Sequence, residues 1–162
     1  MDDITELVNQ MDPNDLREIL VGERNLMLEG GNMFDDVSRI NQENVAATLK
    51  YIYETILPAI GIDRKWAQPL GSTGKRLPGG SSGDIDLGID ATKVDYLKDA
   101  MTADEQAKAI AEYATPILDK LGIKSRLKGN LYSIRCPIQN FDGKQKNEFV
   151  QLDMMTSRNM KF

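Results

Sequence analysis

The sequence contains no histidine and only one cysteine, Cys136. Without histidine, the chain cannot form a Ser-His-Asp or Cys-His catalytic centre, or a zinc site with histidine ligands. A single cysteine also excludes an internal disulfide and a cysteine-rich zinc site. Acid–base and metal chemistry must therefore rest on carboxylates, lysines and tyrosines, and carboxylates favour hard cations such as Mg²⁺ or Mn²⁺.

Long apolar runs and an excess of positive charge are absent as well. No apolar stretch approaches the roughly 18 residues that a membrane span needs. The N-terminus (MDDITELV) is acidic, unlike a signal peptide. The formal net charge of −5 argues against a protein that coats nucleic acid, although it leaves room for a local basic groove. We expect a soluble cytoplasmic protein with no membrane partner.

The length of 162 residues predicts one main domain with a core of its own. Residues 1–31 have the pattern of two short helices divided at Pro13, and we expect them to form an N-terminal helical appendage. Such an appendage packs on the domain, or joins the chain to a second copy or to a partner chain. Residues 32–162 form the main domain.

Helical and strand patterns alternate along the main domain. Apolar spacing predicts a helix over about 42–60 and a second helix that begins at a capping box of Thr102 and Glu105. Pro116 should kink or divide this second helix, and Gly122 should end it. Strands are expected over about 66–70, 84–90, 131–138 and 147–155. This order predicts an α+β fold, a small mixed β-sheet with helices packed on it.

The most informative stretch is residues 70–90, LGSTGKRLPGGSSGDIDLGID. In a strand, alternate side chains point to opposite faces, so Asp84 and Asp86 stand together while Ile85 faces the core. Two neighbouring carboxylates repel each other and are costly to desolvate unless a cation lies between them. The pair therefore indicates a divalent metal site.

A third carboxylate, Asp153, lies on the polar phase of a later strand. If it meets Asp84 and Asp86, the three can hold two metal ions about 3.5–4 Å apart, which is the arrangement that promotes in-line phosphoryl transfer. Asp153 can also accept the proton of an attacking hydroxyl.

The loop before Asp84 has residues suited to a polyphosphate. Gly71 and Ser72 allow backbone amides and a hydroxyl to approach phosphates closely, and Lys75 or Arg76 can neutralise their charge. A P-loop is excluded because Pro69 stands where its first glycine belongs and Arg76 follows Gly74-Lys75. An EF-hand loop from Asp84 is excluded because it lacks the required glycine and final glutamate.

Together these residues resemble a known family. Leu70-Gly71-Ser72, then Ser82-Gly83-Asp84-Ile85-Asp86-Leu87, is similar to the signature of the DNA polymerase β-like nucleotidyltransferase superfamily. The strand Phe149–Met155 resembles the one that carries the third carboxylate of that family. The resemblance covers about residues 42–155, the catalytic palm. It implies two Mg²⁺ ions and transfer of a nucleoside monophosphate from an NTP, with ATP as the expected donor, to a hydroxyl.

The acceptor is left open by the sequence: an RNA end, a protein hydroxyl or a small-molecule alcohol all fit. A basic strand pattern of Lys124, Arg126 and Lys128 suits either simple exposure or a nucleic-acid acceptor, and Arg135 suits either a salt bridge or a phosphate contact. The alternative function is a non-catalytic nucleotidyltransferase-like domain, or a catalytic fragment, that serves as an NTP-binding or assembly module.

Overall fold

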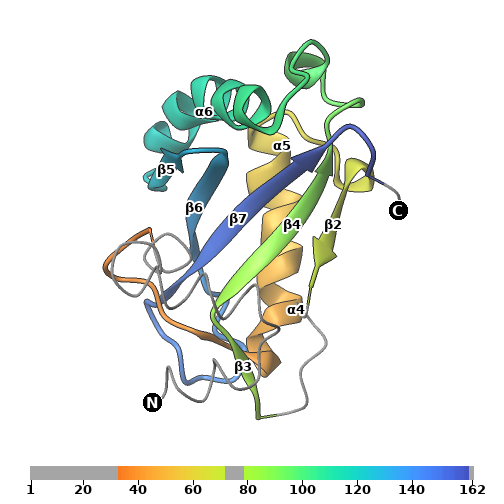
Figure 1. The fold of residues 1–162 in the computed structure, drawn as a ribbon. Coiled ribbons are helices and arrows are strands. Elements are labelled where there is room, and N and C mark those ends of the chain that lie inside the picture. The colour runs from red at the N-terminus through yellow and green to blue at the C-terminus, as the bar shows by residue number, and fades with distance from the viewer. Residues whose placement is uncertain (1–32, 72–78, 161–162) are drawn as a thin grey trace, which may run out of the picture. The chain divides into compact units, whose positions relative to one another are not determined.

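The computed structural model describes residues 33–71 and 79–160, and every helix and strand named below belongs to one unit, Asp36–Phe162 (Figure 1). The helical appendage predicted over residues 1–31 lies outside the described residues and stays a prediction.

The centre of the unit is a five-stranded mixed sheet with the strand order β2-β4-β7-β6-β5. In that order the strands are Ala67–Leu70, Asp84–Asp90, Phe149–Ser157, Leu131–Pro137 and Ser125–Lys128. β4 and β7 run parallel, and the other neighbours are antiparallel. A short second sheet pairs β1 (Ile40–Asn41) with β3 (Ser81–Ser82). The predicted α+β class with a small mixed sheet is therefore confirmed.

A long helical segment lies behind β4 and β7 (Figure 1). It consists of α4 (Gln42–Tyr51), a π-helical turn (Ile52–Ile56) and α5 (Leu57–Ala59), which agrees with the helix predicted over 42–60. The π-helical turn was not predicted. It comes just before Pro58, whose ring in a regular helix would clash with the carbonyl four residues earlier. The wider turn relieves that crowding.

The second helix, α6 (Ala103–Lys120), begins and ends as its sequence indicates. Thr102 and Glu105 form the predicted capping box. At the other end Gly122 has a φ of 74°, and the N–H of Ile123 donates to the Leu118 carbonyl over 2.9 Å, a Schellman ending. Pro116 does not divide the helix, which continues to Lys120. No described helix is long and apolar enough to cross a membrane.

The two faces of the sheet differ in chemistry. One face is apolar and packs against both helical segments, with these strand residues fully or almost fully buried: Ile85, Leu87, Ile89, Tyr132, Ile134, Cys136, Val150, Leu152 and Met154. The opposite face, here called the carboxylate face, carries the alternate residues, among them Asp84, Asp86 and Asp153. None of the described helices covers the carboxylate face (Figure 1).

The capping box gives a first prediction. Thr102→Ala removes the acceptor for the Glu105 N–H and should lower the free energy of unfolding by about 1 kcal/mol. Urea denaturation measures this change. The control is Glu112→Ala at an exposed position in the middle of α6, which should shift stability by less than about 0.5 kcal/mol. Equal losses in the two variants would contradict a specific role for the cap.

Candidate metal centre

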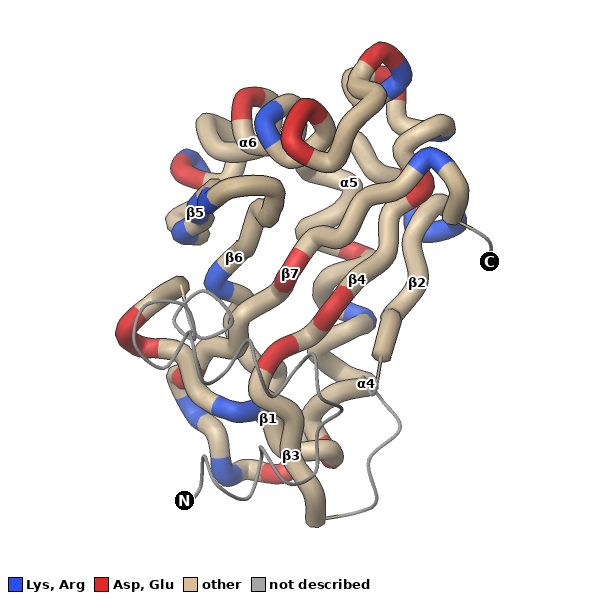
Figure 2. The backbone as a smooth tube through the Cα atoms, in the orientation of Figure 1, with Lys and Arg blue, Asp and Glu red and all other residues tan. Residues whose placement is uncertain are grey.

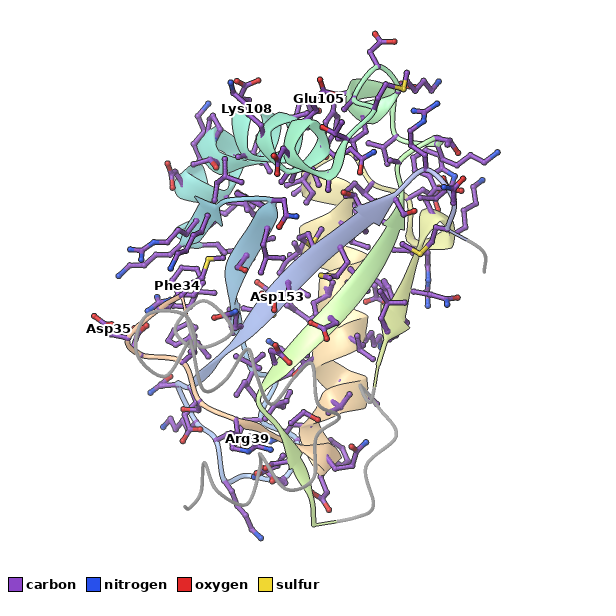
Figure 3. The ribbon with its side chains drawn as sticks, in the orientation of Figure 1. Phe34, Asp35, Arg39, Glu105, Lys108 and Asp153 are labelled. Atoms are coloured by element: carbon purple, nitrogen blue, oxygen red, sulfur yellow. The ribbon has the colours of Figure 1, made fainter. Side chains whose placement is uncertain are left out.

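Three aspartates from two neighbouring strands lie together on the carboxylate face. Asp84 and Asp86 come from β4 and Asp153 from β7, and the parallel register places Asp86 directly beside Asp153. One carboxylate oxygen from each residue lies within 4.8 Å of the other two. Figure 2 shows the acidic positions of β4 and β7 side by side, and Figure 3 shows Asp153 near the middle of the sheet.

Asp153 is held in place by two neighbours. The Ser133 hydroxyl on β6 donates to Asp153 Oδ1 over 2.6 Å, and the Gln151 side-chain amide donates to the same oxygen over 2.9 Å. Asp153 is only 6% exposed, and both donors are buried. Because these two donors share one oxygen, neither of them uses Oδ2. Sequence reasoning missed Ser133 and Gln151, although both occupy the same polar phase of their strands as Asp153.

The packing of the cluster raises the affinity of Asp84 and Asp86 for protons. Burial, followed by the charges of Asp86 and Asp153, raises the pKa of Asp84 to about 7. Burial and the neighbouring Asp153 raise the pKa of Asp86 to about 6. In each case removal from water and like-charge repulsion both disfavour the ionised form. The cluster therefore needs either protons or a cation to balance it at neutral pH.

A divalent cation fits the donor set. Carboxylate oxygens are hard ligands, and the described part of the chain brings no sulfur or nitrogen ligand into the cluster. A group of three such oxygens suits Mg²⁺ or Mn²⁺, which complete their coordination with water and substrate oxygens. A bound cation would also remove the repulsion that raises both pKa values.

Gly71, at the end of β2, borders the cluster. Its φ is +63°, and a Cβ added there would lie 3.7 Å from Asp86 Oδ2. The left-handed backbone favours glycine and brings the chain close to the carboxylate. Ser72, Lys75 and Arg76, the other predicted phosphate contacts, lie outside the described residues.

Arg39 lies at the Asp84 end of the cluster, and the sequence did not predict it as a site residue. Its guanidinium donates to the hydroxyl and the carbonyl of Ser81, over 2.8 and 3.0 Å. Its positive charge opposes the rise in the pKa of Asp84. No local pattern marks Arg39, because only the β1–β3 pairing brings it near Asp84.

Arg135 is engaged in other contacts. Its guanidinium forms an ion pair with Asp36 and stacks on the Phe149 ring, with 3.8 Å between the guanidinium carbon and the ring centroid. Of the two interpretations of Arg135, a salt bridge or a phosphate contact, the structure supports the salt bridge.

A pocket of about 480 Å³ lies elsewhere, and its walls include Tyr53, Arg64 and Trp66. It adjoins the start of β2, where Ala67 pairs with Ile89, at the opposite end of β4 from Asp84. Trp66 is partly buried against the core there. The aspartate cluster takes no part in this pocket.

The chain matches no protein-family model and no curated protein sequence. The assignment of a function therefore rests on the residues themselves and on their arrangement.

The raised pKa of Asp84 predicts a stability that depends on pH. Its folded-state pKa of about 7 lies above the ordinary value of 3.8, so the folded state binds the proton more tightly. Metal-free protein therefore loses stability as the pH rises through 7. Asp84→Asn should be more stable than wild type at pH 8 in EDTA, by an amount on the order of 1–2 kcal/mol after allowance for solvent screening.

Urea denaturation at pH 4 and pH 8 tests this prediction, because the difference should decrease as the pH falls below 7 and largely vanish near the ordinary pKa of 3.8. The control is Asp90→Asn, on the same strand and face but at the far end from the cluster. If Asp84→Asn were no more stable than wild type at pH 8, or if Asp90→Asn gave the same gain, charge repulsion in the cluster would not be the cause.

Proposed function

We propose that the chain is a metal-dependent nucleotidyltransferase that transfers a nucleoside monophosphate from an NTP to a hydroxyl. One observation carries the proposal: Asp84, Asp86 and Asp153, predicted from their spacing as metal ligands, have carboxylate oxygens within 4.8 Å of one another. The Gly71 turn beside Asp86 adds a close backbone approach for a phosphate. The three carboxylates and the glycine turn are the site residues that the resemblance to the DNA polymerase β-like superfamily implies.

Each residue of the cluster has a role in the proposed reaction. Asp84 and Asp86 would hold Mg²⁺ or Mn²⁺, which when bound neutralises triphosphate charge and lowers the pKa of the attacking hydroxyl. The acceptor oxygen forms a bond to the α-phosphorus of the NTP, and the bond from that phosphorus to pyrophosphate breaks. Asp153, as a further ligand, accepts the proton that the hydroxyl loses. Ser133 and Gln151 keep its carboxylate oriented for that transfer.

The donor is proposed to be ATP. Gly71 would let backbone amides approach the phosphates of ATP. Ser72, Lys75 and Arg76 remain the side chains that we propose to bind the triphosphate. Because NTP and Mg²⁺ are abundant in the cytoplasm, we propose that the protein acts there.

Metal and nucleotide binding test the proposal directly. Wild-type protein should bind Mn²⁺, and binding should tighten in the presence of ATP, because the triphosphate supplies additional oxygen ligands. Asp86→Asn should lower Mn²⁺ affinity by more than the roughly 10–100-fold that loss of a supporting hydrogen bond costs. Electron paramagnetic resonance of free Mn²⁺ measures the Mn²⁺ affinity of each protein, first without nucleotide and then with each NTP in turn.

Asp90→Asn is the matched control, since Asp90 lies on the same strand and face but accepts hydrogen bonds from Thr92 instead of joining the cluster. It should bind Mn²⁺ as wild type does. If wild type binds neither metal nor NTP, the proposal is wrong. Binding without transfer to any acceptor in a cell extract would instead favour a non-catalytic NTP-binding module.

Ser133 provides a separate prediction. Ser133→Ala removes the 2.6 Å hydrogen bond to Asp153 and should weaken Mn²⁺ binding about 10-fold, because supporting hydrogen bonds orient metal ligands. Isothermal titration with Mn²⁺ measures this loss. Ser125→Ala is the control, because its hydroxyl accepts from Tyr132. Unchanged affinity in Ser133→Ala would show that Asp153 is not oriented by this bond.

A further inference from the structure

The carboxylate face continues beyond the metal centre to an edge strand rich in positive charge. Lys124, Arg126 and Lys128, here called the basic strip, occupy alternate positions at β5, and all three are exposed. Figure 2 shows basic positions gathered at β5. The whole chain has a net charge of −5, so the positive charge at β5 is a local feature of the surface.

The strand register places the basic strip on the same face as the aspartates. Arg126 is opposite Ser133, and Ser133 is opposite Asp153, which in turn is beside Asp86. Directly opposite residues in a sheet project to the same face. Arg126, Ser133, Asp153 and Asp86 therefore form one row across four neighbouring strands. Two strand spacings, about 10 Å, separate the backbone of the strip from that of Asp153.

The spacing of the strip suits a chain of anions. Alternate residues on a strand are about 7 Å apart, so the three cations form an evenly spaced row along the edge of the sheet, beside β6. A polymer with a phosphate on every unit can meet all three at once. A single small anion would meet only one or two of them.

An apolar surface lies next to the strip. Lys128 pairs with Leu131, and Leu131 and Met155 line a pocket of about 190 Å³ together with Asn130. Met155 is 42% exposed. Cations in a row bind the phosphates of a single-stranded nucleic acid, and the apolar side chains beside them offer contact area to its bases.

We propose that the acceptor is the terminal hydroxyl of a single-stranded nucleic acid, whose phosphates bind along the basic strip. The inference rests on the proposed function, since the strip alone provides no chemistry. The strand would lie along β5 and cross β6 so that its end reaches Asp153. The aspartate cluster would then have the donor on the β2 side, at Gly71, and the acceptor on the β6 side.

The test compares two triple variants that lose the same charge. Lys124→Gln/Arg126→Gln/Lys128→Gln removes the strip, and Lys93→Gln/Lys98→Gln/Lys108→Gln removes three exposed lysines elsewhere. Lys108 lies on α6, away from the carboxylate face (Figure 3). Fluorescence anisotropy measures binding to labelled oligouridine and oligothymidine, each of 20 nucleotides, over a range of salt concentrations. Urea denaturation verifies that both variants fold.

Wild type should bind at least one of the oligonucleotides. The strip variant should bind at least about tenfold more weakly at 0.1 M salt, with a salt dependence flatter by about two in the log–log slope, as expected when three phosphate contacts are lost. The control variant should stay within about twofold of wild type. Preference for the uridine or the thymidine strand distinguishes RNA from DNA as the acceptor.

Two outcomes would overturn the inference alone: wild type that binds Mn²⁺ and ATP but neither oligonucleotide, or equal losses in the two triple variants. Failure of the proposed function is separate and appears as absence of Mn²⁺–ATP binding in wild type. The strip variant should keep wild-type Mn²⁺–ATP affinity, while transfer of labelled AMP to the oligonucleotide end should fall in parallel with binding.

Discussion

Repulsion among the carboxylates of Asp84, Asp86 and Asp153 is the constraint on which the carboxylate face depends. Nothing in an isolated strand would hold Asp84, Asp86 and Asp153 so close, because burial and like charge disfavour the ionised forms of Asp84 and Asp86. The parallel pairing of β4 with β7 imposes the proximity, since its register sets Asp86 beside Asp153. A slip of one residue would turn Asp153 toward the apolar core.

The same strands supply the energy that holds the cluster together. Ile85 and Leu87 on β4, and Leu152 on β7, are fully buried beneath the helices on the apolar face. Burial of each such side chain contributes roughly 1.5–3 kcal/mol, which offsets the cost of crowding the charges on the opposite face. Because side chains alternate between the two faces of a strand, one register places the apolar residues in the core and the three aspartates on the carboxylate face.

The order of strands arranges the proposed chemistry across the sheet. On one side of the aspartates, the backbone at Gly71, just after β2, approaches Asp86. On the other side, β6 contributes Ser133 to Asp153, and β5 adds the exposed basic strip. A donor and an acceptor bound from these two sides would meet at the carboxylates. The π-helical turn and the Trp66 pocket lie away from that line and have no part in it.

Local patterns in the sequence were enough to predict most elements and the three aspartates. The capping box of α6, the Gly122 ending and the alternation of β4, β6 and β7 depend on neighbours within a few residues, so their causes are visible in the sequence. The turn of π-helix and the uninterrupted course of α6 through Pro116 were not visible in that way. Pro58 disturbs the turn before it, but a proline alone does not determine whether a helix widens, kinks or breaks. For α6, burial of Ala114 and Leu118 on either side of Pro116 favours a continuous helix.

The sequence by itself narrowed the residues that could serve chemistry: with no histidine and one cysteine, carboxylates were the expected metal ligands, and the strand period placed them opposite the core. Tertiary structure alone decided what surrounds them. Ser133 is twenty residues from Asp153 and Arg39 is forty-five from Asp84, yet strand pairing brings each to the cluster. Such contacts depend on strand order and register, which a chain settles only when its whole core is buried.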